Sequence, residues 1–435
     1  MSLDLSRVTI RFTSEGLTLA IIALLWLRAV GTNIAYSLTI DKTFLGAGSE
    51  LAASPLASVV SQGSFLVLAA LCAVVLAFRI NDVTRPGLWH LTIVLLPWLW
   101  AVVRDAYSGI LQPDALLYVL IVVAIAALRP NPRVLALVGI LTAVTAVIAI
   151  ALGWFTPEAG LLREIDGQVR VRADKEILNG WGLLQGMFFS ENTLGQYLAL
   201  GSIGLVWLRP RLLAVALLGV ITFAIVWSAS RGALFALGAA IAVVVIVGVV
   251  KAWGRVDIAA GLARLALFGA LAAIVVIPMV SWPDDAFSER GVIWRVSLIE
   301  WADRAAAFGL GSDWYARIAD SEISPFHAGA VHGHNDVIQL LITGGLVAAV
   351  LWATWVVVAG LTLTTPRNPH LVGATALLVA MLVSGVLETA TSSPNSSSLW
   401  GVIQIPLCIL FFAPFPGPTV AAAPFPQPRT LRATS

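Results

Sequence analysis

Long apolar runs separated by short polar breaks fill almost the whole chain. A membrane-crossing helix needs roughly 20 mostly apolar residues, and about twelve runs approach that length. None alternates with the two-residue period of a barrel strand, so each must close its own backbone hydrogen bonds as a helix. The pattern predicts an all-α fold, a polytopic integral membrane helical bundle of about twelve transmembrane helices with two long structured loops. The runs are residues 17–34, 59–78, 88–103, 115–128, 134–154, 193–208, 212–227, 233–250, 265–280, 337–363, 371–387 and 399–412.

Composition excludes an ordinary soluble domain. The chain is 59% hydrophobic and 11% charged, and its mean hydropathy is +0.92. Its net charge of +2 gives no reason to expect nucleic acid as a partner. Cys72 and Cys408 sit inside apolar runs, where we expect small core residues rather than a disulfide or metal pair. Arg28 interrupts the first run, so we expect that run to stay as an anchor, with Arg28 touching lipid phosphate, snorkelling, or pairing within the bundle.

Positive charges orient the helices. They are concentrated in every second loop, as at Arg79, Arg129 and Arg209, whereas the loops between hold few. Because positive charge near helix ends stays cytoplasmic, we predict that both termini are inside. The long loops, at about residues 155–192 and 281–335, then lie outside the cytoplasm. We divide the chain into a bundle at residues 1–413 and a proline-rich, disordered cytoplasmic tail at 414–435.

The two long loops carry local patterns of their own. In the first, Asp166 and Gly167 favour a tight turn, which predicts a short β-hairpin over residues 161–172. The hairpin would present Arg170 near the surface, and solvated ion pairs are the alternative role for its charges.

The second loop has one apolar helical face. Trp294, Leu298, Trp301, Ala305 and Phe308 follow one another at spacings of four, three, four and three. We expect this face to pack on the bundle or lie on the bilayer, with its tryptophans as interfacial anchors or as a platform for stacking sugars. Glycines at 309 and 311 are predicted to end the helix.

Two polar breaks at the outer membrane boundary are the main site candidates, because charges there are costly without a task. Ser230, Arg231 and Gly232 form the first, and we expect Arg231 near a helix start, where backbone donors and the dipole favour an anion. A planar guanidinium suits phosphate or diphosphate. A structural arginine bonded to loop carbonyls is the alternative.

The second break contains His332, His334, Asn335 and Asp336 ahead of an apolar helix. Asn or Asp beside a first turn is an ordinary helix start, but this does not explain the histidine. An imidazole titrates near neutrality, which suits a general base toward a sugar hydroxyl. A metal site that adds His327 is the alternative, although the spacing matches no closed zinc pattern. We therefore expect no metal.

Residues 334–345, HNDVIQLLITGG, resemble the signature of the O-antigen ligase and O-antigen polymerase superfamily, and so does Ser230-Arg231-Gly232 at a helix start. Between them, Arg290 with Trp294 and the following glycines resemble the family's large periplasmic loop. Residues 186–192 resemble its segment before the middle helices.

The resemblance implies a metal-independent, cofactor-free glycosyltransferase of cell-envelope polysaccharide biosynthesis, in the bacterial cytoplasmic (inner) membrane. Its donor would be an oligosaccharide on undecaprenyl diphosphate and its acceptor a glycan or lipid-core hydroxyl, on the extracytoplasmic face. By resemblance, His334 would activate the acceptor, with His332 as its rival, and Arg231 and Arg290 would hold the diphosphate. Further candidate substrate contacts are His332, Asn335, Asn192 and Arg170.

A secondary transporter or a flippase of lipid-linked sugars is the competing function, because many-helix bundles with charges at broken helices also describe transporters. Transporters concentrate charge near mid-membrane, whereas here most charge lies at the outer rim, which favours chemistry. The sequence does not separate ligase from polymerase, because the acceptor is chosen by the shape of a groove.

Overall fold

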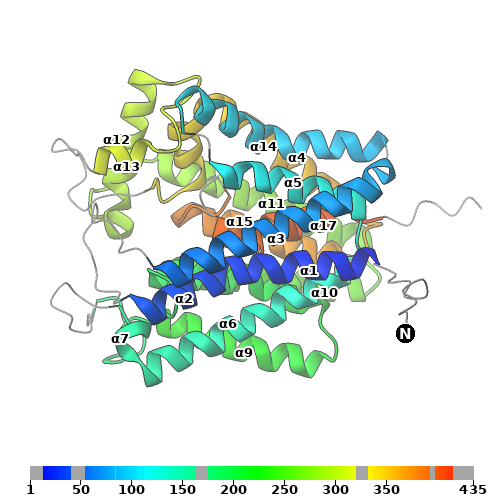
Figure 1. Cartoon of the computed structure of the whole chain (residues 1–435), viewed down its shortest axis with the longest axis horizontal. Coiled ribbons are helices and arrows are strands. Elements are labelled where there is room, and N and C mark those ends of the chain that lie inside the picture. The colour runs from blue at the N-terminus through cyan, green and yellow to red at the C-terminus, as the bar shows by residue number, and fades with distance from the viewer. Residues whose placement is uncertain are drawn as a thin grey trace, which may run out of the picture.

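A computed structural model describes residues 13–40, 54–83, 85–110, 112–162, 174–319, 332–391 and 397–414. Over these residues the chain is a bundle of helices laid along one long axis (Figure 1), with no β-strand apart from a single bridge between Leu161 and Leu184. Eight helical segments are long and apolar enough to cross a membrane, and three shorter apolar helices accompany them. The predicted all-α, polytopic membrane fold is confirmed.

Each predicted run falls on helix. The spanning segments are α1 (Ser14–Trp26) continued by π-helix η2 (Leu27–Gly31) and α2 (Thr32–Thr39), α3 (Pro55–Arg79), α4 (Arg85–Tyr107), α6 (Ala136–Phe155), α9 (Arg211–Ser228), α10 (Arg231–Ala252), α11 (Val256–Met279) and α14 (Asp336–Leu363). The three shorter ones are α5 (Pro113–Leu128), α15 (Leu371–Leu387) and α17 (Gln404–Phe412). The predicted run 193–208 falls on α8 (Glu191–Gly201) with the 3-10 helix η5 (Ser202–Trp207). Outside the runs lie α7 (Pro157–Gly160), α12 (Ala286–Arg304), α13 (Trp314–Ala319) and η3 (Ile80–Asp82). The short helices η4 (Pro132–Leu135) and α16 (Ser397–Trp400) overlap the starts of the runs 134–154 and 399–412.

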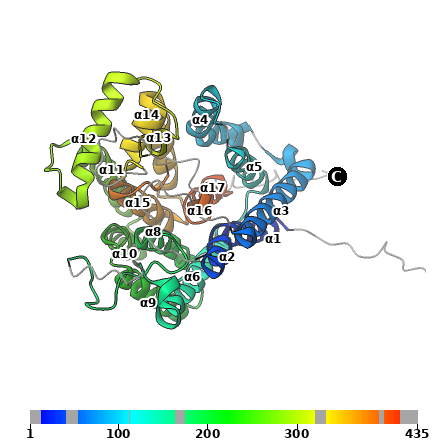
Figure 2. The same cartoon turned by 60° about the vertical axis from the view of Figure 1, so that its left-hand side comes forward.

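The short helices α15 and α17 occupy the middle of the bundle. Figure 2 shows α16 and α17 surrounded by the longer helices. Every residue of α17 is buried, and so are nearly all residues of α15. Because other helices shield them from lipid, their length need not match the thickness of the hydrocarbon core.

Arg28 is paired inside the bundle. Its Nη2 donates to both carboxylate oxygens of Asp114 on α5, at 2.6 and 2.8 Å, and Nη1 donates to the Ser61 carbonyl at 2.7 Å. The Arg28 side chain is only 10% exposed. Of the three expectations for this residue, pairing within the bundle is therefore the correct one. Cys72 and Cys408 are free and buried, as predicted.

The helix predicted over residues 337–363 is broken at Gly345. This glycine has φ +71° and ψ −168°, a conformation that side chains other than glycine rarely adopt. The segment after α12 fills the break, with the Leu310 amide donating to the Ile342 carbonyl and the Leu346 amide to the Ala306 carbonyl. Broken backbone at this depth is tolerated because protein, not lipid, surrounds it.

This pairing also explains where α12 ends. The helix stops at Arg304, before the glycines predicted to end it, because residues 305–311 leave the helix to bond with α14. The apolar face of α12 packs on the bundle at Trp294, which is 1% exposed, whereas Phe308 remains 60% exposed beyond the helix. In Figure 1, α12 and α13 lie at the end of the bundle opposite to the start of α1.

Substitution of Gly345 by alanine is expected to destabilise this junction. A Cβ at Gly345 would lie 2.3 Å from the Ala307 carbonyl oxygen, and the unusual backbone alone would cost about 1–3 kcal/mol. The matched control is Gly238→Ala in α10, where a Cβ would meet nothing within 4 Å. Thermal unfolding in detergent should show a lower midpoint for Gly345→Ala than for the wild type. The midpoint of the control should not be lowered. Equal midpoints would contradict the described break.

Candidate active site

Helix ends from distant parts of the chain meet around the last turn of α15. Arg290 of α12 donates from Nε to the Leu387 carbonyl at 2.8 Å. A Cβ placed on Gly232, in the first turn of α10, would lie 3.7 Å from the Leu387 Cβ. His334, just before α14, places its Nδ1 3.2 Å from Glu388 Oε2. The structure thus brings the two polar breaks of the sequence to one place.

Asn335 fixes the start of α14 at this junction. Its side-chain oxygen accepts from the amides of Val337 and Ile338, at 2.8 and 3.0 Å, as an N-cap does. Its amide nitrogen donates to the carbonyls of Ile274 and Val386, both at 3.1 Å. The residue is fully buried. One side chain therefore ties α14 to α11 and α15, and the predicted helix start is confirmed.

Asp336 holds the chain that follows Glu388. Its Oδ1 accepts from the amides of Ala390 and Thr391, at 2.8 and 3.0 Å, and its Oδ2 from the Thr391 hydroxyl at 3.0 Å. The carboxylate lies so close to α15 that a Cβ on Gly385 would be 2.5 Å from Oδ2. Asn335 and Asp336 thus fix both sides of Glu388.

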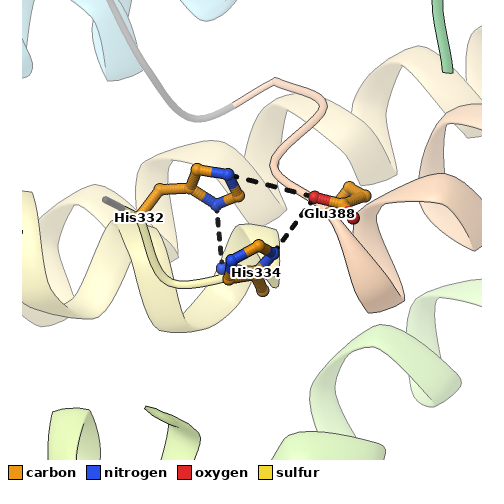
Figure 3. A group of neighbouring side chains, drawn as sticks. All are labelled: His332, His334 and Glu388. Carbon is orange, nitrogen blue, oxygen red and sulfur yellow. Dashed lines mark hydrogen bonds and ion pairs between the residues drawn. The ribbon is translucent and has the colours of Figure 1, made fainter. Parts of the chain in front are cut away.

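Glu388 is the residue that sequence reasoning missed. One of its oxygens pairs with Arg290, the other faces His334, and its side chain is 11% exposed (Figure 3 shows the histidine side). The available signal was a carboxylate directly after the apolar run 371–387, on the predicted outer side.

The histidines differ in their surroundings. His332 accepts at Nδ1 from the His334 backbone amide at 3.2 Å, and its Nε2 lies 4.0 Å from Glu388 (Figure 3). Enclosure lowers the pKa of His332 below its usual range, with the neighbouring His334 and Arg290 lowering it further against the effect of Glu388. His332 is therefore a neutral ring near pH 7.

Glu388 is a stable carboxylate. Burial acts to raise its pKa, but the charge and hydrogen bond of His334, followed by Arg290 and His332, outweigh burial and hold the pKa below its usual range. An ionised Glu388 is an acceptor for a proton on His334 Nδ1, so this contact orients the ring and leaves Nε2 for another partner. None of the described residues bonds that nitrogen.

The two arginines are held in different ways. Besides Leu387 and Glu388, Arg290 donates from Nη1 to the Phe287 carbonyl at 2.8 Å, so protein acceptors take three of its five N–H donors. Arg231 begins α10 as predicted, is exposed, and donates from Nη2 to the Asp174 carbonyl at 2.9 Å. Within the described residues that carbonyl is its hydrogen-bond partner, which leaves most of its fork accessible.

The remaining candidates lie nearby or outside the described residues. Asn192 lies half-buried in the first turn of α8. Its backbone N–H donates to the Ser190 hydroxyl at 3.1 Å. Gly195, one turn further, packs against Ser230, so α8 begins beside the Arg231 turn. Arg170, with the predicted hairpin turn, and the tail from residue 415 lie outside the described residues.

The donor atoms of His332, His334 and Glu388 lie within 4.8 Å of one another, close enough to hold a metal ion. This group of possible metal ligands differs from the group considered in the sequence, which contained His327 and Asp336 in place of Glu388. His327 lies outside the described residues, and Asp336 is turned to Ala390 and Thr391 instead.

Comparison with known proteins finds a family model that matches the middle of the chain. Residues 197–353, which include Arg231, Arg290 and His334, match the family model described as O-antigen ligase. The matched range includes the segments that carry the resemblance noted in the sequence, except residues 186–192. The match supports the O-antigen ligase and polymerase superfamily.

A curated relative supports the same superfamily. A protein of Pseudomonas aeruginosa described as an O-antigen ligase is 27% identical over 248 residues, which are 54% of this chain and 56% of the relative. The match thus spans about half the length of that relative. Both matches therefore show what this chain is similar to over its middle part, the O-antigen ligases.

Neutralising Glu388 is expected to destabilise the chain. Glu388→Gln removes the charge that Arg290 and His334 share, and breaking a buried pair costs about 3–5 kcal/mol. Glu300→Gln, which removes an exposed pair with Arg304, is the control and should cost about 0–1 kcal/mol. Thermal unfolding in detergent measures both, and equal midpoints would argue against the bridge.

The lowered pKa of Glu388 adds a pH signature to the same pair of variants. Its contribution to stability is fully present above the unfolded value of about 4.3 and is lost as pH falls through the folded pKa. The stability difference between wild type and Glu388→Gln should therefore shrink on acidification.

Proposed function

We propose that the chain is a glycosyltransferase that moves a glycan from undecaprenyl diphosphate to a hydroxyl of an acceptor glycan or lipid core. The contact between His334 Nδ1 and Glu388 Oε2 is the observation that carries the proposal, because it orients the imidazole as a base at the junction where α10 also begins with Arg231. The family match supports the substrate class. The P. aeruginosa relative is described as a ligase, but polymerase activity remains equally open for this chain.

His334 acts as the general base in this proposal. Its Nε2 takes the proton of the acceptor hydroxyl while the hydroxyl oxygen attacks the anomeric carbon of the donor. The bond from that carbon to the diphosphate oxygen breaks, and the imidazolium that forms is stabilised by Glu388. Nδ1 of His332 already accepts a hydrogen bond, and its lowered pKa makes it a weaker base. These facts favour His334 over its neighbour.

Arg231 stabilises the leaving diphosphate. Its accessible fork at the start of α10 and the dipole of that helix favour negative charge at the same place. Arg290 keeps two N–H donors for the diphosphate while it positions Glu388. Preorganised donors of this kind supply much of the stabilisation of a developing anion.

The reaction proceeds without a metal ion in this proposal. Glu388 already shares its charge with Arg290 and His334, so a cation between the histidines would compete with two existing interactions. Arginine then performs the charge neutralisation that a divalent metal performs elsewhere. The side-chain hydrogen-bonding groups of Asn335 bind backbone atoms of three helices, which supports a positioning role for this residue rather than a substrate contact. Asn192 and Arg170 stay candidate contacts.

The same proposal includes orientation. The chain lies in the bacterial inner membrane with both termini cytoplasmic and the site at the extracytoplasmic face. The grouping of α12 and α13 at the end opposite to the start of α1 supports it (Figure 1), together with the basic residues of alternate loops.

His334→Ala is expected to abolish transfer while donor binding persists, because a base acts on the acceptor. The measurement is release of undecaprenyl diphosphate from a lipid-linked oligosaccharide by protein in nanodiscs, with excess EDTA present. His332→Ala, in the same loop, is the control and should keep more activity than His334→Ala. Product size then separates polymerase from ligase.

Three outcomes of that assay would contradict parts of the proposal. Normal turnover by His334→Ala would remove it as the base. Loss of wild-type turnover in EDTA would favour a metal at His332, His334 and Glu388. Specific binding of the lipid-linked sugar without transfer to any acceptor would favour a flippase or transporter.

Arg231→Lys is expected to weaken donor binding at least about tenfold, because a point charge cannot reproduce a bidentate fork. The control is Arg255→Lys, an exposed residue at the cytoplasmic end of α11 in the proposed orientation. Donor affinity can be measured by titrating the lipid-linked oligosaccharide. Wild-type affinity in Arg231→Lys would indicate a structural arginine.

A further inference from the structure

A cleft of about 740 Å³ lies far from the site, at the other end of the bundle. It opens between α9 and α10 and reaches η5 and the start of α15. Arg211 begins α9 at its mouth, whereas Arg231 begins α10 at the opposite end of the bundle. The family match and the proposed transfer reaction assign no role to this cleft.

The cleft has an apolar wall about one membrane leaflet deep. Its lining along α10 runs from Leu237 to Gly248, a rise of about 16 Å, or roughly half of the hydrocarbon core. Val215, Ile241 and Val245 line it and are 65%, 41% and 54% exposed, so it is open sideways between the helices. A chain molecule in the bilayer could therefore enter from the lipid.

Positive charge gathers at the mouth. Arg133, Arg209 and Arg211 line the cleft, and no aspartate or glutamate does. Within the described residues, Arg133 and Arg209 have no ion-pair partner. Arg211 is anchored to the carbonyls of Val206 and Leu208, which fixes its guanidinium at the rim.

The positive charges at the mouth also affect the pKa of His370. Burial lowers its pKa, and the charges of Lys251 and Arg133 lower it further. Its Nδ1 accepts from the Trp207 indole at 3.2 Å, and the amine of Lys251 donates to the Pro369 carbonyl at 3.0 Å. Because His370 is neutral and the Lys251 amine is bonded to a carbonyl, the arginines of the cleft are the groups that would bind an anion.

We propose that this cleft binds one anionic glycerophospholipid, with its phosphate headgroup among Arg133, Arg209 and Arg211 and an acyl chain along α10. The length of the apolar wall matches an acyl chain in one leaflet, and the charge at its mouth matches a headgroup at the membrane surface. In the proposed orientation this leaflet is the cytoplasmic one. Lipid binding here is independent of the transfer chemistry.

The affinity test uses purified full-length protein and phosphatidylglycerol, with phosphatidylcholine for comparison, titrated by native mass spectrometry. Phosphatidylglycerol should bind more tightly, and Arg133→Gln and Arg209→Gln should each weaken it about fivefold. Arg255→Gln is the matched control, since this arginine is exposed at the same end but does not line the cleft. Equal affinity for both lipids, or no loss in either cleft variant, would overturn the proposal.

The location test uses phosphatidylglycerol with a photoactivatable acyl chain in phosphatidylcholine nanodiscs. The label should map to residues 237–248. The amount of label should decrease in Val244→Trp, because the larger side chain occupies space beside the apolar wall without changing the charge of the cleft. Label spread evenly over other lipid-facing helices, or unchanged in Val244→Trp, would show annular lipid instead and would overturn the proposal. Monodisperse elution of each variant confirms that it is folded.

Discussion

The site depends on the sharing of one carboxylate, Glu388, between Arg290 and His334. A charge buried at a membrane boundary is costly unless it is paired and hydrogen-bonded. Here the pairing joins α12, the start of α14 and the end of α15, three elements that are far apart in the sequence. The interaction that satisfies the charge thus also sets the orientation of the imidazole.

The neighbouring polar residues serve this arrangement. Asn335 was a candidate for substrate contact and Asp336 for metal binding, yet both are buried and bonded to backbone on either side of Glu388. The glycines near residue 345 allow the segment after α12 to enter the break in α14. A compact string of residues therefore combines a candidate base, its support and a backbone junction.

The helices could be predicted from the sequence because apolar runs in a membrane have only one way to satisfy their backbone. The starts of α10 at Arg231 and of α14 after Asn335 followed from small and capping residues. Glu388 and the break at Gly345 could not be predicted in the same way, since both depend on contacts across more than 30 residues of chain. Hydrophobic periodicity carries no information on such contacts.

The two ends of the bundle carry different chemistry. One end combines an acid, histidines and accessible arginine, and the other offers arginines above an apolar wall. Both suit phosphate-bearing lipids, but the first places an imidazole against a carboxylate, whereas the lining of the second contains no aspartate or glutamate. We therefore place the proposed transfer reaction at the first end of the molecule.

The most direct test of the mechanism is a structure of the protein with a non-hydrolysable undecaprenyl diphosphate sugar. The account predicts the diphosphate within hydrogen-bond distance of Arg231, with the anomeric carbon on the Nε2 side of His334 and Glu388 still bonded to Nδ1. A diphosphate bound elsewhere, or a metal ion between His332, His334 and Glu388, would contradict it.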